Sequence, residues 1–117
     1  ILSSTQLYPN GNEQDIQTVF KILSGSFESE NSQKWEAEEV KSNVLKIDRG
    51  LDTIEYFGFD EENKKFYLLD ISSSGTHKKS FQLNNTNDLS LMENGETIFK
   101  FYTLHSFSYK GIQFFRQ

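Results

Sequence analysis

The stretch IEYFGFDEENKKFYLLDISSSG, residues 54–75, contains the pattern that decides the fold. Two runs rich in aromatic and branched side chains flank the polar segment 60–63, Asp-Glu-Glu-Asn. Asp and Asn favour tight turns because their short side chains bond to nearby backbone groups, and Asn63 tolerates a positive φ. Gly58 relieves crowding where the first run bends. The stretch therefore predicts a β-hairpin with a type I turn at 60–63.

The chain after Gly25 repeats this alternation of extended runs and turn residues. Asn94-Gly95 lies between two runs and is a strong hairpin signal, because both residues accept the positive φ of a two-residue turn. Eight consecutive strands with short connections predict an antiparallel meander. The predicted runs are 24–35, 36–48, 52–60, 64–73, 76–84, 88–94, 96–107 and 109–117.

One helix is predicted before the strands, over residues 13–23. Its apolar residues recur at i, i+3, i+4 and i+7, which is the spacing of one helix face. These residues are Ile16, Val19, Phe20 and Leu23. The polar residues before it, 1–12, are expected to form an N-terminal arm.

The meander is expected to close on itself. An open sheet exposes two strand edges, and closure into a barrel removes them. We therefore expect a mainly β fold: an up-and-down meander of about eight strands, closed into a barrel, with one short N-terminal helix. Eight strands enclose a space that side chains fill or that holds one small ligand. A β-sandwich is the alternative. The domains are then an arm, 1–12, and one barrel, 13–117.

Composition excludes several classes of function. Aromatic residues make up 15% of the 117 residues and eleven are Phe, so a core of few, large side chains is expected. The net charge is −5 and no run of Lys or Arg exceeds two, which argues against a nucleic-acid partner. The absence of Cys excludes disulfides and thiolate nucleophiles. No apolar run reaches the length of a membrane span.

Alternation along the strands indicates which side chains line the barrel. In the run 96–107, Phe99, Phe101 and His105 share a face without long charged side chains, so this face is expected to point inward. Trp35, the only tryptophan, is expected to pack across the closed end. The predicted ligand-binding residues of the lumen are Phe27, Trp35, Phe57, Tyr67, Phe99, Phe101 and His105.

The chain contains no motif of a common enzyme class. It lacks a Gly-x-Ser-x-Gly elbow, a Gly-rich phosphate loop, a His-Glu-x-x-His zinc motif and a dinucleotide fingerprint. We therefore expect no catalytic residue, no metal and no cofactor. An enzyme centred on His105 with a carboxylate such as Asp70 is the alternative.

Three segments resemble a known group of proteins. The first, Leu23-Ser24-Gly25-Ser26-Phe27, is similar to a short helix that leads into a first strand. The second, 57–75, is similar to a central hairpin through Gly58, Phe59, Asp60, Lys65 and Phe66, and the third, 95–117, to a closing hairpin that ends in an aromatic residue and Arg. Together they resemble the bacterial lipocalin-like barrels of unknown function, related to calycins and nitrobindins. The resemblance implies a non-enzymatic, often exported barrel. No His lies in a recognisable haem-ligand motif near the C-terminus, so haem is not expected.

Two functions fit these expectations. The first is non-enzymatic binding of a small apolar or amphipathic ligand in the lumen. A lumen filled by its own Phe side chains, with no open pocket, would refute it. The second is a solid barrel or sandwich that acts as a structural or protein-interaction module, with the aromatic last strand, 112–117, as an open edge for a homodimer or another protein. The expected location is periplasmic or secreted, since a removed leader would explain a chain that begins at Ile1.

Overall fold

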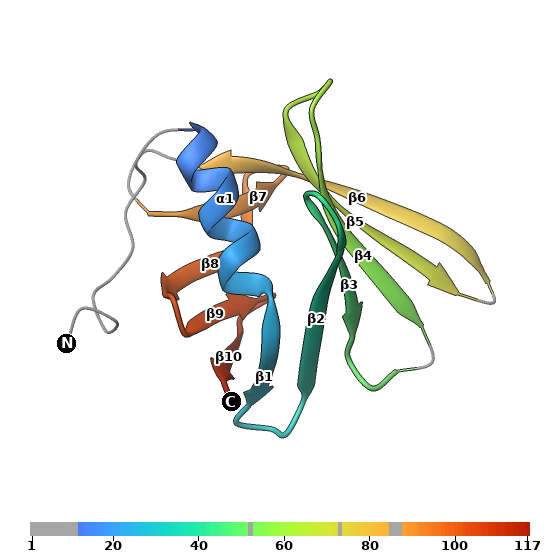
Figure 1. Cartoon of the computed structure of the whole chain (residues 1–117), viewed down its shortest axis with the longest axis vertical. Helices are drawn as coiled ribbons and strands as arrows, with labels where there is room; N and C mark the ends of the chain where they lie inside the picture. Colours follow the sequence, from blue (N-terminus) through green and yellow to red (C-terminus); the bar gives the residue numbers. More distant parts are fainter. Residues whose placement is uncertain (1–11, 52, 73, 85–87) are drawn as a thin grey trace.

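The computed structural model describes residues 12–51, 53–72, 74–84 and 88–117. The predicted arm, 1–12, lies outside these ranges except for Asn12, the first residue of the helix. The helix is followed by ten strands (Figure 1). The elements are α1 (Asn12–Leu23), β1 (Gly25–Ser29), β2 (Lys34–Lys41), β3 (Val44–Asp48), β4 (Ile54–Asp60), β5 (Lys65–Ser72), β6 (Gly75–Asn84), β7 (Ser90–Glu93), β8 (Glu96–Thr103), β9 (Ser106–Tyr109) and β10 (Ile112–Arg116).

The strands form one closed antiparallel barrel. Each strand pairs with its neighbours in sequence, and β1 pairs with β10 to close the ring. This confirms a mainly β fold with a closed meander and one N-terminal helix. The strand number is ten rather than about eight because turns divide the predicted runs. Ser32 (φ 62°) and Asn43 (φ 60°) supply the positive φ in the first two of these turns.

The third such turn divides the predicted run 96–107. β8 ends at Thr103 and β9 begins at Ser106, with Leu104 and His105 between them. The Thr103 hydroxyl accepts a hydrogen bond from the backbone N–H of His105 (3.0 Å) and lies 3.1 Å from the Ser106 hydroxyl. These local side-chain bonds offer the backbone an alternative to a continuous strand.

The predicted turn between β4 and β5 is confirmed. Oδ1 of Asp60 accepts hydrogen bonds from the N–H groups of Glu62 (3.0 Å) and Asn63 (3.3 Å), and Nδ2 of Asn63 donates to Oδ2 of Asp60 (2.8 Å). These bonds, first that of the Asn63 side chain, lower the pKa of Asp60. The positive φ falls on Lys64 (56°) rather than on Asn63. Asn94-Gly95 forms the predicted turn, with φ values of 53° and 82°.

Aromatic rings fill the barrel next to the helix. Phe20 of α1 lies 5.6 Å from Phe57, and Trp35 lies 5.0 Å from Phe107 and 5.7 Å from Tyr109, all between ring centroids. Edge-to-face pairs of this kind add about 0.5–1.5 kcal/mol each beyond their buried area. The fully buried aromatic residues are Phe27, Trp35, Phe57, Phe66, Phe81, Phe99, Phe101, Phe107 and Phe114.

Trp35 connects this core to the end of α1. Its indole Nε1 donates a hydrogen bond to the carbonyl oxygen of Leu23 (3.1 Å), and its side chain is almost fully buried. The bond satisfies one of the carbonyls that a helix leaves unpaired at its C-terminus. Trp35 therefore packs between the aromatic core and the end of α1.

Arg116 joins the last strand to the same helix end. Its Nη1 donates to the carbonyl of Ser24 (2.8 Å), and its Nη2 donates to those of Ile22 (3.2 Å) and Leu104 (2.9 Å). A cation is favoured there because the helix dipole is negative at its C-terminus. Gly25 is required beside it, because its φ is 118° and a side chain would overlap the Arg116 guanidinium.

Among the residues that the structure describes, one long strand edge of the closed ring has no pairing partner. β6 pairs with β5 from Gly75 to Phe81, but its register with β7 covers only Gln82–Asn84. Residues 75–81 therefore have a neighbouring strand on one side, and in Figure 1 β6 extends well beyond β7. The prediction that the last strand provides the open edge is wrong, because β10 pairs with β1 on one side and β9 on the other.

Candidate functional site

The structure brings five of the seven predicted lumen residues together. Each is at most 2% exposed, and they pack against one another and their aromatic neighbours as one core. Phe57 and Trp35, for example, both contact Phe99, at centroid distances of 5.6 and 6.1 Å. The five are Phe27, Trp35, Phe57, Phe99 and Phe101. Their rings fill the lumen beside α1, which counts against a ligand buried at that depth.

Tyr67 lies on the outside of the barrel, and its lumenal placement is corrected. On β5 the buried residues are Phe66 and Leu68, so the alternating Tyr67 points outward. Its ring covers Gly58 of β4, where a Cβ would overlap it, and Nζ of Lys78 lies 5.2 Å from its centroid. Both faces of this strand are apolar in sequence, so alternation alone left its inward face undecided.

His105 is also placed outside the lumen. It is exposed in the β8–β9 turn, because the reversal at Leu104 interrupts the alternation that had aligned it with Phe99 and Phe101. Asp70, its partner in the enzyme alternative, lies near the end of β5. That strand end is at the opposite end of the barrel from α1, whereas Leu104 contacts Arg116 at the helix end. The two residues are therefore not brought together.

Charged residues gather where the aromatic core ends. Each is two residues from a buried core residue in sequence: Arg49 and Asp70 come two residues after Ile47 and Leu68, and Glu55 comes two residues before Phe57. We call this group the polar mouth. Its members are Arg49, Glu55, Asp70, Lys79, Tyr109 and Lys110.

An ion pair forms the inner part of the polar mouth. Nε of Arg49 donates to Oε1 of Glu55 (2.6 Å) and Nη2 donates to Oε2 (3.2 Å). Glu55 is only 5% exposed, and a buried carboxylate is tolerated when such a paired cation compensates its lost hydration. The guanidinium also lies 5.3 Å from the ring centroid of Tyr109. Burial is the main cause that raises the pKa of Tyr109. The charge of Arg49 lowers this pKa, and the nearby carboxylates raise it.

Asp70 lies next to this pair. It is opposite Glu55 on β4 and opposite His77 on β6. Like charges directly opposite each other in a sheet are unfavourable. Of the two carboxylates, Arg49 bonds to Glu55 and not to Asp70. Oδ1 of Asp70 is buried and has no hydrogen-bond partner within the described residues. A buried oxygen of this kind is rare in folded proteins and requires an explanation.

Two lysines complete the polar mouth from different parts of the chain. Lys79 is on β6 and Lys110 is in the β9–β10 turn, where its Nζ lies 5.4 Å from the Tyr109 centroid. The proximity of Lys79 is the first cause that lowers the pKa of Lys110, followed by partial burial and the charge of Arg49. Lys79, Lys110 and Arg49 thus form a group of neighbouring cations at the polar mouth.

This arrangement can bind a small molecule that carries both donors and an anionic group. The carboxylate oxygen of Asp70 accepts an N–H or O–H, and the lysines attract a negative charge. Leu51, two residues after Arg49 in the β3–β4 connection, is an exposed apolar side chain (59%). Sequence reasoning missed the site because Arg49, Asp70 and Tyr109 become neighbours only through strand register. An inward-facing charge at the end of an apolar alternation, as at Glu55, is the signal that the sequence did contain.

A hollow of about 710 Å³ lies elsewhere on the barrel, beside the first turns of α1. Ile16, Phe59 and Leu83 supply its apolar part. Its ion pair, Lys64 to Glu61 (3.4 Å), is almost three-quarters exposed on both sides, and exposed pairs contribute little to stability or selectivity. We therefore take the polar mouth as the candidate site.

The described part of the chain contains no group of three His, Asp or Glu side chains arranged to hold a metal ion. Across these residues, the helix is too short and too polar to cross a membrane. Comparison of the chain with protein-family models, with curated proteins and with solved structures found no match.

Proposed function

We propose that this barrel binds a small amphipathic ligand, without catalysis, at the polar mouth rather than deep in the lumen. The observation that carries the proposal is the buried, unpartnered Oδ1 of Asp70. It lies beside an ion pair that is already satisfied, so the most direct way to satisfy it is an N–H or O–H from a bound molecule. The likeness of the chain to exported lipocalin-like barrels supports the same proposal and an extracytoplasmic location.

The ligand is expected to bridge opposite charges. The proximity of Lys79 lowers the pKa of Lys110, and a bound carboxylate, sulfonate or phosphate would relieve the repulsion between the two ammonium groups. The same molecule would present a donor to Asp70 and an apolar part to Leu51. This combination favours a compact amphipathic molecule over a long alkyl chain, because the aromatic core already occupies the lumen.

Two measurements test the proposal. Native mass spectrometry of protein purified without denaturation is expected to show a retained small molecule. Titration with 8-anilinonaphthalene-1-sulfonate, which has an N–H donor, a sulfonate and aromatic rings, is expected to change the fluorescence of Trp35, whose ring lies 5.7 Å from that of Tyr109. Asp70→Asn is expected to weaken binding of this probe about tenfold, since one hydrogen bond to a charged group is lost.

Glu61→Gln is the matched control. It removes one carboxylate charge from the hollow beside the first turns of α1 and leaves the polar mouth unchanged. Equal affinities of wild type and Asp70→Asn, with weaker binding by Glu61→Gln, would place the probe in that hollow and refute the assignment. A native mass without any added molecule, together with no saturable probe binding, would refute ligand binding itself.

A further inference from the structure

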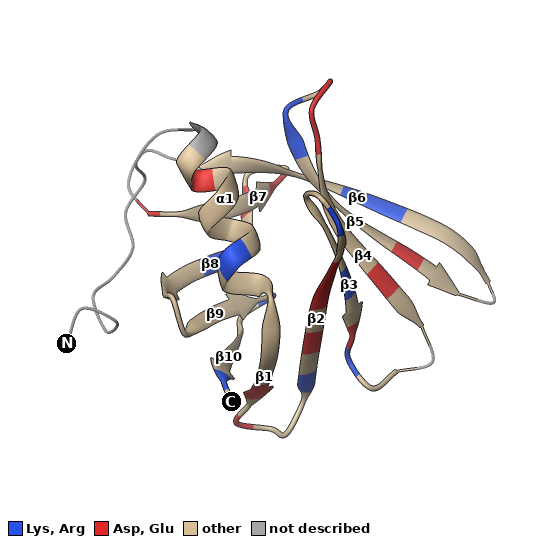
Figure 2. Ribbon diagram, in the orientation of Figure 1, with Lys and Arg blue, Asp and Glu red and all other residues tan. Residues whose placement is uncertain are grey.

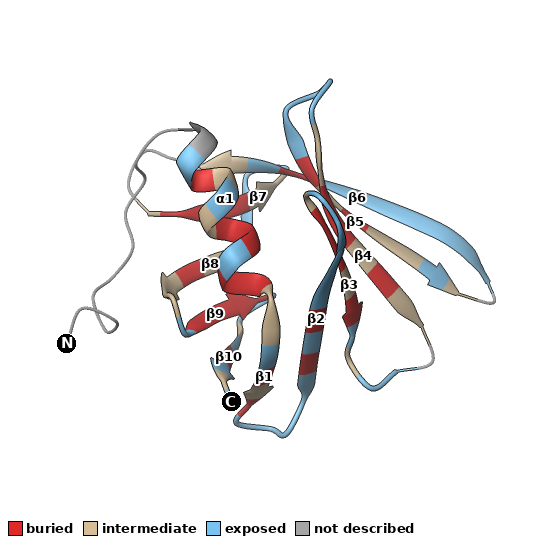
Figure 3. Cartoon of the chain, in the orientation of Figure 1, coloured by how far each residue is buried: buried red, intermediate tan, exposed pale blue. Residues whose placement is uncertain are grey.

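The unpaired edge of β6 differs from the polar mouth and carries a separate inference. β6 continues from Gly75 to Phe81 beyond the residues that pair with β7. All residues from Gly75 to Ser80 are exposed, as the pale strand in Figure 3 shows. A strand edge of this kind presents a row of backbone N–H and C=O groups that a further strand can pair with.

The register tells which backbone groups face the free side. The β5–β6 hairpin closes at the pair Ser72 and Gly75, and residues flanking a two-residue loop exchange both their hydrogen bonds. Hydrogen-bonded pairs then alternate along the ladder, so His77 and Lys79 bond to β5. The N–H and C=O groups of Thr76, Lys78 and Ser80 therefore point to the free side.

The side chains along this edge are basic. Gly75–Asn84 contains Lys78, Lys79 and His77 and no acidic residue, in a chain with a net charge of −5. Figure 2 shows the two lysines as a blue segment in the middle of β6. Lys78 lies on the outer face over Tyr67, and the alternating Lys79 lies on the inner face. An added strand would thus meet a positive charge on both of its faces.

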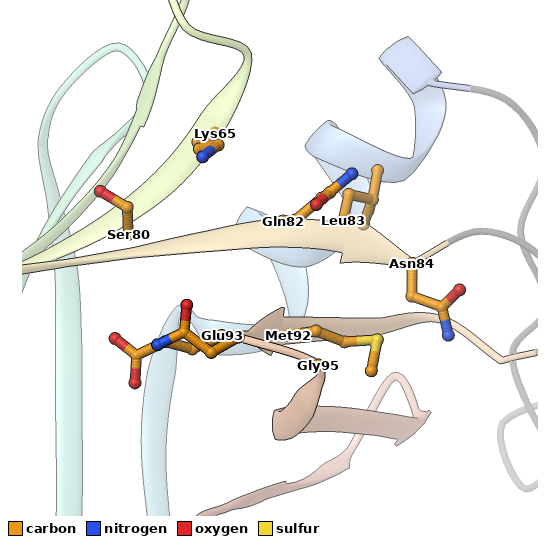
Figure 4. Close-up of a pocket in the computed structure, with 9 residues that line it drawn as sticks. Lys65, Ser80, Gln82, Leu83, Asn84, Met92, Glu93 and Gly95 are labelled. Atoms are coloured by element: carbon orange, nitrogen blue, oxygen red, sulfur yellow. The ribbon is translucent and has the colours of Figure 1, made fainter.

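A pocket marks where the added strand would begin. It has a volume of about 400 Å³ and lies where β7 stops and β6 continues, between Ser80 and Gln82 of β6 and Met92 and Glu93 of β7 (Figure 4). A strand that extends the line of β7 would place one end beside Glu93. The thioether of Met92 offers an apolar, adaptable surface for its first side chain.

We infer that residues 75–81 of β6 dock an extended, acidic segment of a partner protein by strand addition. Backbone hydrogen bonds to Thr76, Lys78 and Ser80 provide affinity, and acidic side chains opposite Lys78 and Lys79 provide selectivity. A second copy of this chain is disfavoured, because antiparallel pairing of two β6 edges about Lys78 puts like charges directly opposite each other.

Amide hydrogen exchange measured by NMR tests this inference on the intact chain. The probes are two peptides long enough to span 75–81, one of alternating Glu and Thr and one of alternating Lys and Thr. The acidic peptide is expected to slow exchange at Thr76, Lys78 and Ser80. The amides of His77 and Lys79, which already bond to β5, are the internal control and are expected to change little.

Variants separate the roles of charge and backbone. Lys78→Glu is expected to weaken binding of the acidic peptide about fivefold, from reversal of one cross-strand charge pair. Lys34→Glu, the same charge change at an exposed position on β2, is the control and is expected to leave binding unchanged. Ser80→Pro removes one outward N–H and is expected to weaken binding about tenfold. If this variant does not fold, the charge variants and the exchange pattern still decide.

Three outcomes would overturn the inference. They are equal binding of the basic peptide, the absence of new protection at the three outward amides, and protection that appears without peptide and grows with protein concentration. The last outcome would assign the edge to a second copy of the chain. Lys79 belongs to both sites, so this test depends on Lys78 and on the three outward amides, which are not part of the polar mouth.

Discussion

Replacement of Arg116 by Met removes the connection between the last strand and the helix while keeping most of the side-chain stem. Three hydrogen bonds are lost, to the carbonyls of Ser24, Ile22 and Leu104, at 2.8, 3.2 and 2.9 Å. The guanidinium also leaves the ring of Phe27, which lies 4.6 Å away. The carbonyls then depend on water at a partly buried helix end.

The expected loss follows from these contacts. A hydrogen bond to a charged group contributes about 1.5–3 kcal/mol when buried, and we take about 1 kcal/mol each because Arg116 is partly exposed. The contact with Phe27 adds about 0.5 kcal/mol, so the free energy of unfolding is expected to fall by about 3.5 kcal/mol. Arg116→Lys keeps the charge but not the planar fork, and is expected to lose about half as much.

Urea unfolding followed by the fluorescence of Trp35 measures this change, because Trp35 is buried and bonds to the same helix end. Lys34→Met, at an exposed position on β2, is the control for removal of a positive charge. A loss for Arg116→Met no larger than that for Lys34→Met would refute the reasoning. So would wild-type stability of Arg116→Lys, since the argument depends on the divergent donors of the guanidinium.

Two further predictions concern the polar mouth and the outer face. The pKa of Lys110 is below 10.5 in the folded chain, so the folded chain releases this proton at a lower pH than the unfolded chain does. The free energy of unfolding therefore rises with pH up to about 10.5. The pKa of Tyr109 is above 10.0 in the folded chain, so the free energy of unfolding falls as the pH rises beyond about 10. Urea unfolding across this pH range measures both effects. The rise in the free energy of unfolding is expected to disappear in Lys110→Gln, and the fall is expected to disappear in Tyr109→Phe. Profiles that match wild type in both variants would contradict both predictions. Gly58→Ala forces the Tyr67 ring off the outer face and is expected to cost about 1–2 kcal/mol. In a Tyr67→Ala background that cost should disappear in thermal unfolding, whereas equal costs in both backgrounds would contradict the placement of Tyr67.

Much of the fold could be predicted from the sequence, because it depends on the local chemistry of individual residues. The hairpin of β4 and β5 depends on Asp60 and Asn63, whose side chains bond within the turn as their residue types favour. The helix could be predicted from the spacing of its apolar residues, and the burial of Trp35 from the size of its side chain. The turn at Leu104 and His105 escaped prediction because neither residue is a turn former. It depends on the hydroxyls of Thr103 and Ser106, which flank it.

The candidate site could be predicted much less well, for a different physical reason. Alternation gives two faces to each strand but does not say which one is inside when both are apolar, as with Tyr67 and Phe66. The stagger between strands is set by closure of the whole barrel. That stagger, and not local sequence, aligns Glu55 with Asp70 and brings Arg49 over Tyr109. The pairing of β6 with only a short β7 is likewise a property of the assembled ring.

The clamp between Arg116 and the end of α1 also has a consequence for the order of folding. It joins residues separated by 92 and 94 positions, and β10 must pair with β1 for the ring to close. Contacts so distant in sequence carry a high loop-closure entropy and slow the search for the native state. During synthesis, α1 and β1 leave the ribosome long before their partner strand exists. The helix α1 and strand β1 therefore wait for β10 before the aromatic core is enclosed.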